Sequence, residues 1–228
     1  LDKTCTPEET VAKAREALSA SGKNILAQTR RIDTGRLGIP VFMSMCGEDA
    51  REIMPTRKQM GKGASPAQAE ASALMELAER FSYFSYWNDP ANFQTMTWSE
   101  AKKTFGDRLL PTRYIIQSVN DTLSESEAER ILDLLPWQFT SVTDIGAARE
   151  YMAPLDWFKK LNEFNGSSAG NTLEESMLQG GCELVERHVC AVIDRTHQET
   201  PTIDPASFTD PVLVELHEKF ANQGIKVW

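Results

Sequence analysis

Residues 165–187 read NGSSAGNTLEESMLQGGCELVER, and this stretch decides how we interpret the fold. It begins as a glycine-rich turn and continues as a long helix, for which Thr172 is the expected N-terminal cap. Its last five residues, ELVER, are nearly repeated by ELAER at residues 76–80. Each copy carries two glutamates three positions apart and then an arginine. The two copies are therefore either two solvated helix faces or two halves of one site.

The surroundings of the two copies also match. With ELAER aligned on ELVER, both copies have a turn glycine followed by a small hydroxyl cap: Gly63 with Gly170, and Ser65 with Thr172. Pro66 then occupies the first helical position of the first copy, where a backbone N–H is not needed. The pattern predicts a pseudo-symmetric pair of long helices, although the residues between the matching positions agree poorly.

Helical spacing places the polar residues of each helix on one face, because residues three and four apart are neighbours on an α-helix. The stripe consists of Ser72, Glu76, Glu79 and Arg80 in the first helix and of Glu175, Gln179, Glu183 and Glu186 in the second, with Ser168 and Asn171 in the turn before it. The other faces are largely apolar, and we expect these flanks to pack in a core. They carry Leu74, Leu77, Ala78 and Phe81 in the first helix and Leu178, Leu184 and Val185 in the second.

Carboxylates that converge from two helices repel each other unless a divalent cation neutralises them. Magnesium prefers oxygen ligands and often completes its shell with substrate phosphates. Arginines and a glycine-rich turn at a helix N-terminus suit phosphate oxygens. The repeat and the added Ser, Gln and Asn residues favour such a metal–nucleotide site. A surface ion-pair face on each helix remains the alternative on the residues alone.

The bulk composition narrows the class of protein. A chain of 228 residues with a net charge of −9 has no basic block, which argues against a nucleic-acid partner but not against a nucleotide. The four cysteines show no metal-binding spacing, so we expect reduced thiols in a cytoplasmic protein, with Cys182 and Cys190 buried in the second helix. No apolar run approaches 18 residues, so no membrane partner is expected.

The rest of the chain reads as short helices and strands within one domain, residues 1–228. Thr6, Pro7 and Glu9 form a capping-box start for a helix that stops at Gly22. Residues 38–47 predict a strand, and residues 97–106 and 124–137 predict short helices. Near the end we expect an amphipathic helix, a stop at Gly224 and the beginning of a strand, and therefore a missing C-terminal part.

The two helices resemble the ATP-binding signatures of the YcaO domain family. The spacing S-x-x-x-E-x-x-E-R at residues 72–80 is similar to the first signature, and residues 168–187 fit the second, S-x6-E-x3-Q-x3-E-x-x-E-R. The family's third signature, R-x-x-x-E, lies well downstream of the second. RTHQE at residues 195–199 has that spacing but follows too closely, so we expect the third signature beyond Trp228.

This resemblance implies an α+β fold with a mostly antiparallel sheet, and two pseudo-equivalent signature helices packed against the sheet and facing one site. It implies ATP and Mg²⁺ as cofactors but assigns no catalytic residue. The implied metal ligands are Glu76, Glu79, Glu183 and Glu186. The implied nucleotide-binding residues are Ser72, Arg80, Ser168, Asn171, Glu175, Gln179 and Arg187.

The resemblance further implies activation of a peptide backbone amide by O-phosphorylation, with a peptide or protein as substrate. The product is an azoline or, with a sulfur-donor partner, a thioamide. The chain looks most like the stand-alone bacterial members, which carry the label ribosomal protein methylthiotransferase accessory factor, so a methylthiotransferase partner and a homodimer are further expectations. The alternative is a non-catalytic scaffold of the same fold that binds a nucleotide or a partner.

Overall fold

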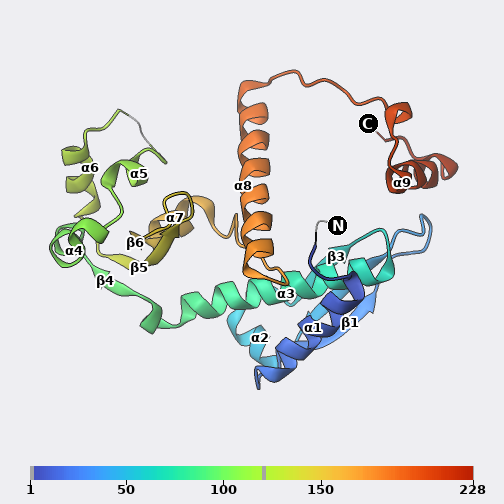
Figure 1. Cartoon of the computed structure of the whole chain (residues 1–228), viewed down its shortest axis with the longest axis horizontal. Coiled ribbons are helices and arrows are strands. Elements are labelled where there is room, and N and C mark those ends of the chain that lie inside the picture. Colours follow the sequence, from blue (N-terminus) through green and yellow to red (C-terminus); the bar gives the residue numbers. More distant parts are fainter. Residues whose placement is uncertain (1–2, 120–121, 228) are drawn as a thin grey trace. The chain divides into compact units, whose positions relative to one another are not determined.

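The computed structural model describes residues 3–119 and 122–227 (Figure 1). The chain forms two compact units. Unit 1 comprises Leu1–Ser85 and Asn165–Trp228, and unit 2 comprises Tyr86–Phe164. None of the helices in the described ranges is long and apolar enough to cross a membrane.

Unit 1 combines a three-stranded antiparallel sheet, of order β1-β2-β3, with five α-helices among its described residues. Its elements are α1 (Pro7–Ala20), β1 (Leu26–Arg31), β2 (Val41–Cys46), α2 (Glu48–Ile53), β3 (Lys58–Lys62), α3 (Pro66–Asn88, whose last residues belong to unit 2), α8 (Leu173–Thr196), η3 (Pro205–Ser207) and α9 (Pro211–Asn222). The predicted capping box is confirmed: Thr6 accepts from the Glu9 backbone, and the Glu9 side chain accepts from the Thr6 backbone.

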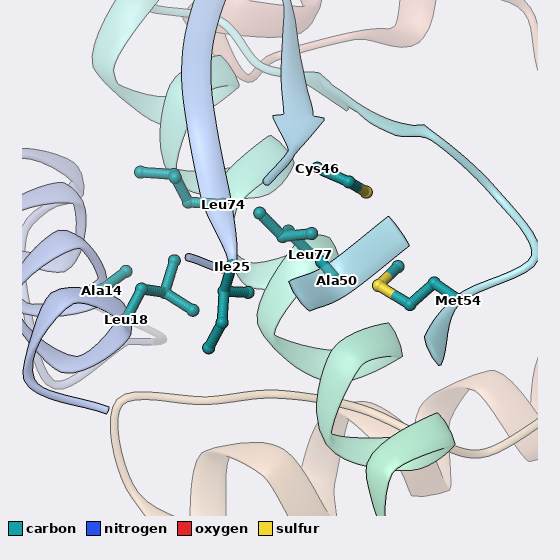
Figure 2. Close-up of a cluster of buried hydrophobic side chains, with 8 residues drawn as sticks. All are labelled: Ala14, Leu18, Ile25, Cys46, Ala50, Met54, Leu74 and Leu77. Carbon is teal, nitrogen blue, oxygen red and sulfur yellow. The ribbon is translucent and has the colours of Figure 1, made fainter. Parts of the chain in front are cut away.

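The core of unit 1 lies where α1, α2 and α3 meet around the sheet (Figure 2). Its buried members are Ala14, Leu18, Ile25, Cys46, Ala50, Met54, Leu74 and Leu77. The strand β3 runs directly against α3, because a Cβ on Gly61 would stand 2.2 Å from both the Ala69 carbonyl oxygen and the Ala73 nitrogen. The Ser44 hydroxyl donates to the Ala73 carbonyl at 2.8 Å. The predicted packing of the first signature helix on the sheet is therefore confirmed.

The second signature helix, α8, differs from expectation. Its start is as predicted, with Thr172 accepting a hydrogen bond from the Glu175 N–H. Its apolar flank is not buried, however: Leu178, Leu184 and Val185 are 63%, 51% and 64% exposed. Periodicity identifies the apolar side of a helix, but burial requires a tertiary neighbour that periodicity does not name. The predicted burial of Cys182 and Cys190 on this helix is wrong for the same reason, since both are exposed.

Unit 2 has a second three-stranded antiparallel sheet, of order β4-β5-β6. Its elements are η1 (Pro90–Asn92), β4 (Gln94–Met96), α4 (Trp98–Phe105), η2 (Gly106–Arg108), α5 (Thr112–Ile116), α6 (Glu125–Leu132), β5 (Trp137–Asp144), β6 (Arg149–Pro154) and α7 (Leu155–Asn162). A separate core forms around buried Trp98, Ile115 and Phe139. The α+β class is thus confirmed, with two small antiparallel sheets in place of the one expected.

The C-terminal segment ends in a capped helix. Asp210 accepts from the Val212 and Leu213 N–H groups at the start of α9, and Gly224 takes a φ of +66° just after it. The Ile225 N–H then bonds back to the Phe220 carbonyl at 3.0 Å. Residues 225–227 consequently close the helix and do not form the expected strand, while Trp228 lies outside the described residues.

Candidate functional site

The site begins with a cavity of about 570 Å³ in unit 1. Six of the residues selected from the sequence line it: Ser72, Glu76 and Glu79 from α3, Asn171 from the turn, and Glu175 and Gln179 from α8. This volume falls within the range of small-molecule sites. Parts of both polar stripes therefore line one cavity, whereas Arg80, Glu183, Glu186 and Arg187 are not among its lining residues.

The segment before α1 also lines this cavity, although sequence reasoning assigned it no role. Lys3, Cys5 and Thr6 contribute to the wall, as do Thr10 of α1 and Lys62 at the end of β3. The Thr4 N–H donates to a Glu175 carboxylate oxygen. No local pattern links a residue near the N-terminus to a helix that starts far along the chain, so the sequence carries no signal for this contact.

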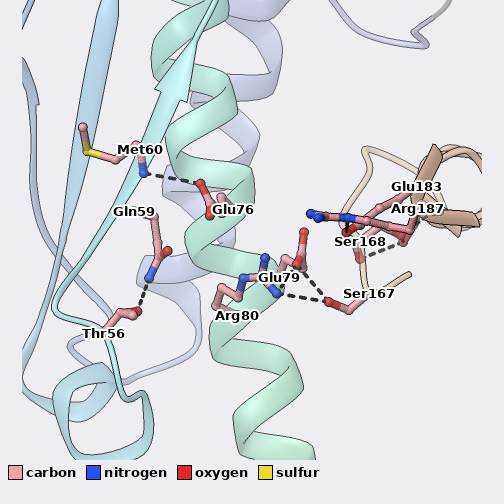
Figure 3. Close-up of polar contacts among 11 residues, drawn as sticks. Thr56, Gln59, Met60, Glu76, Glu79, Arg80, Ser167, Ser168, Glu183 and Arg187 are labelled. Carbon is pink, nitrogen blue, oxygen red and sulfur yellow. Dashed lines mark hydrogen bonds and ion pairs between the residues drawn. The ribbon is translucent and has the colours of Figure 1, made fainter. Parts of the chain in front are cut away.

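The Glu79 side chain is 16% exposed and contacts Arg80 and Ser167 (Figure 3). Its Oε1 accepts from the Ser167 hydroxyl at 2.9 Å and lies 3.1 Å from Arg80 Nη1. Burial of the carboxyl raises its pKa, the Arg80 charge and the Ser167 hydrogen bond oppose that rise, and the charges of Glu183 and Glu76 add to it. Glu76 and Glu183 therefore each act electrostatically on the Glu79 carboxyl.

The other predicted metal ligands are engaged differently. Glu76 Oε2 accepts from the Met60 backbone N–H at 3.3 Å, which ties α3 to β3. On α8, Glu183 Oε1 lies 3.7 Å from Arg187 Nε, and Glu186 is exposed. Figure 3 shows Glu183 and Arg187 extending from α8 towards the face of α3 that carries Glu79. No three His, Cys, Asp or Glu side chains within the described ranges are gathered closely enough to hold a metal ion.

The glycine-rich turn before α8 is held down on the helix by two serines. Ser176 donates through its hydroxyl to the Ser168 carbonyl at 2.9 Å, and the two hydroxyl oxygens lie 3.1 Å apart. A Cβ on Gly180 would stand 2.4 Å from the Gly166 carbonyl oxygen. Ser168, which the signature assigns to nucleotide, thus faces the backbone of α8 and is not part of the cavity wall that Asn171 and Glu175 line.

Glu175 is buried, and both of its carboxylate oxygens accept hydrogen bonds. Its Oε2 accepts from the Asn171 N–H at 2.8 Å and from the Asn171 amide group at 3.1 Å, and its Oε1 accepts from the Thr4 N–H. These hydrogen bonds, with the Thr4 N–H as the largest contribution and the Asn171 N–H next, lower the pKa of Glu175 to about 2. The carboxylate therefore anchors both the turn and the N-terminal segment at the edge of the cavity.

The donor set fits a hard divalent cation and a polyphosphate. The predicted ligands offer carboxylate oxygens, which Mg²⁺ prefers, and the cavity wall adds hydroxyl and amide groups and the two lysines Lys3 and Lys62. The raised pKa of Glu79 shows that its charge is incompletely compensated by the protein. A cation supplied with a phosphate ligand would provide that compensation. Fold and cavity together define an α+β protein with a carboxylate-lined cavity of the size of small-molecule sites.

Residues 60–228 match the family described as YcaO cyclodehydratase, ATP- and Mg²⁺-binding, and the chain belongs to this family. The match covers both signature helices and leaves out α1, β1, β2 and α2. The expected cofactors agree with the family's description.

Two curated relatives align along nearly the whole chain. One, from Methanothermobacter thermautotrophicus, is 28% identical over 230 residues, which are 97% of this chain and 55% of the relative. The other, encoded in the region 3′ of tfuA in Rhizobium leguminosarum bv. trifolii, is 26% identical over 242 residues, which are 99% of this chain and 52% of the relative. The chain thus spans about half the length of the curated relatives it matches.

Two solved structures share the fold. A heterocyclase in complex with substrate and cofactor superposes with a TM-score of 0.69 at 23% identity, covering 97% of this chain and 32% of the heterocyclase. YcaO from Methanopyrus kandleri, bound with AMPPCP and Mg²⁺, superposes with a TM-score of 0.63 at 19% identity, covering 98% of this chain and 54% of that protein.

Proposed function

We propose that the cavity of unit 1 binds ATP with Mg²⁺ and that the protein uses them to activate a peptide backbone amide. The observation that carries this proposal is that Glu76 and Glu79 of α3 and Glu175 and Gln179 of α8 face one cavity of about 570 Å³. The membership of the YcaO family and the nucleotide and Mg²⁺ in the Methanopyrus kandleri protein support it.

In this proposal the glutamates of the two E-x-x-E-R motifs serve metal ions, and the remaining stripe residues contact nucleotide. The metal ligands are Glu76, Glu79, Glu183 and Glu186; the nucleotide contacts are Ser72, Arg80, Ser168, Asn171, Glu175, Gln179 and Arg187. Because the Ser168 hydroxyl bonds to α8, a nucleotide contact through this hydroxyl requires that hydrogen bond to be exchanged. The low pKa of Glu175, about 2, keeps this carboxylate ionised at neutral pH.

The residues of the site would act mainly by positioning and by neutralising charge, as in other phosphoryl transfers. When bound, ATP supplies the phosphoryl group that converts the amide oxygen into a leaving group. The arginines and the turn before α8 hold phosphate oxygens, while the glutamates hold the cation that offsets the phosphate charge. Three outcomes remain candidates: azoline formation, thioamide formation with a sulfur donor, and support of ribosomal-protein methylthiolation.

The experiment measures binding and hydrolysis of ATP by the purified full-length protein at increasing Mg²⁺. Titration calorimetry should show ATP binding that strengthens with Mg²⁺ and weakens in Glu79→Gln, and ADP release should require Mg²⁺. Tight nucleotide binding without any hydrolysis would favour the non-catalytic scaffold. Binding indifferent to Mg²⁺ and to Glu79→Gln would contradict the proposed site.

Partners and organisation follow the same proposal. A peptide or protein substrate, a sulfur-donor or methylthiotransferase partner, a homodimer and a cytoplasmic location are all compatible with the family and await their own measurements. That residues 1–228 belong to one YcaO-like domain is likewise a proposal. The genes adjacent to the one encoding this chain would separate the three outcomes, because a precursor peptide, a sulfur donor and a methylthiotransferase each point to a different one.

A further inference from the structure

Ser167 is the residue of the glycine-rich turn that reaches across to α3, and no signature position includes it. Its hydroxyl donates to Glu79 Oε1 at 2.9 Å, joining two segments that are 88 residues apart in sequence. The neighbouring Ser168, which the signature does include, is bonded to Ser176 of α8 instead. The two adjacent serines therefore have different contacts: Ser168 holds the turn on α8, and Ser167 contacts α3.

The contacts of Glu79 are asymmetric. The hydroxyl of Ser167 and the guanidinium of Arg80 both meet Oε1, at 2.9 Å and 3.1 Å, and Arg80 Nη1 also lies 3.5 Å from the Ser167 hydroxyl oxygen. The Ser167 hydroxyl, the Arg80 guanidinium and Glu79 Oε1 form a triangle in which each group contacts the other two (Figure 3). The described contacts of Glu79 leave Oε2 out of this triangle. Glu79 lines the cavity, and its side chain is only 16% exposed, so its orientation is set by these neighbours.

We propose that Ser167 is a positioning residue that orients the Glu79 carboxylate for the divalent cation. This inference rests on the proposed function, because it assumes that Glu79 is a metal ligand. Hydrogen bonds from a neighbouring side chain fix the direction of a ligating carboxylate, and removing such a partner typically weakens metal affinity about 10–100-fold. The hydroxyl also ties the turn before α8 to α3, so that both signature segments hold the same carboxylate.

A purely structural role for Ser167 predicts something different. If the hydroxyl only fastened the turn to α3, its loss would lower the free energy of unfolding but leave the affinity of the folded protein for metal unchanged. Ser176 provides the matched control, because its hydroxyl fastens the same turn through the Ser168 carbonyl at 2.9 Å and does not touch a predicted metal ligand.

The test measures Mn²⁺ binding by electron paramagnetic resonance in the full-length protein with AMPPCP, alongside urea unfolding. Ser167→Ala should weaken Mn²⁺ binding about 10-fold or more, Ser167→Thr should restore most of it, and Ser176→Ala should leave it within about 2-fold. In a Glu79→Gln background, Ser167→Ala should cause no further loss, because the residue acts through Glu79.

Each contrary outcome overturns a defined statement. Equal Mn²⁺ affinity in the wild type and Ser167→Ala would overturn the positioning role and leave the proposed function intact. An additive loss in the Glu79→Gln background would also overturn it, since Ser167 would then act independently. Absence of Mn²⁺ binding by the wild type would overturn the proposed function and this inference with it. If Ser167→Ala fails to fold, the comparison of Ser167→Thr with the wild type decides, because retained affinity supports the role and a full loss contradicts it.

Discussion

Replacing Gly180 and Gly181 with alanine, one at a time, tests whether the turn before α8 packs directly against that helix. The two residues are neighbours in the same helix, so both substitutions gain the same helix propensity, about 0.8–1.0 kcal/mol. Their surroundings differ completely. A Cβ on Gly180 would stand 2.4 Å from the Gly166 carbonyl oxygen and 3.0 Å from the Ser168 hydroxyl oxygen, whereas a Cβ on Gly181 meets nothing within 4 Å.

The expected magnitudes follow from these distances. Non-bonded heavy atoms prefer about 3.5–4.0 Å, so in Gly180→Ala the Gly166 carbonyl must retreat by about 1 Å. Overpacking of this kind costs about 1–3 kcal/mol. We therefore expect Gly181→Ala to raise the free energy of unfolding by up to about 1 kcal/mol. Gly180→Ala should lie about 1–3 kcal/mol below Gly181→Ala.

The assay is urea unfolding of both variants, followed by circular dichroism and evaluated at unchanged m-value. AMPPCP binding in the presence of Mg²⁺ provides the second readout, and only Gly180→Ala should weaken it, because only that substitution displaces the turn that carries Ser168 and Asn171. Equal stability and equal binding of the two variants would refute the reasoning, since the turn would then not rest on Gly180.

Three further predictions concern the carboxylates and the core. Glu175→Gln should destabilise the protein at neutral pH and flatten its acid unfolding, because the stability due to this carboxylate is present above the ordinary pKa of 4.5 and is lost as the pH falls towards about 2; unchanged acid unfolding would contradict this. For Glu79 the pKa is raised, so the affinity for Mg²⁺ should increase as the pH rises through it, and Glu79→Gln should lower that affinity about 10-fold or more and abolish its pH dependence, as measured by calorimetry. Leu77→Ala should cost about 2–5 kcal/mol of unfolding free energy, because Leu77 is fully buried, whereas Leu178→Ala, 63% exposed, should change it by less than about 0.5 kcal/mol; similar losses in urea unfolding would be inconsistent with the described core.

The helices were predictable because their signals are local. Thr6 with Glu9 and Thr172 with Glu175 each satisfy an N-terminal backbone group within three positions, and Pro66 starts α3 where its ring fits. The polar stripes were predictable for the same reason, since positions three and four apart always share a helix face. The repeat of these local patterns suggested one shared site, and the structure places Glu76 and Glu79 of α3 and Glu175 and Gln179 of α8 on one cavity.

The long-range contacts could not be predicted in this way. The Thr4 N–H donates a hydrogen bond to Glu175, which lies 171 residues away in the sequence, and the local sequence around either residue does not predict this contact. The sequence also could not show which of the two adjacent serines contacts Glu79. The signature spacing selects Ser168, whereas in the structure the turn directs the Ser167 hydroxyl to Glu79. Exposure of Leu184 on α8 likewise depends on which elements lie nearby and not on the period of the sequence.

The most direct test of the central claim is a crystal structure of the full-length protein grown with AMPPCP and Mn²⁺, with the metal located by its anomalous scattering. The account predicts anomalous peaks beside the carboxylates of Glu76 and Glu79 on α3 and of Glu183 and Glu186 on α8. It also predicts that the phosphates of the nucleotide bind in the cavity of unit 1. A nucleotide bound elsewhere, or metal peaks away from these four glutamates, would contradict it.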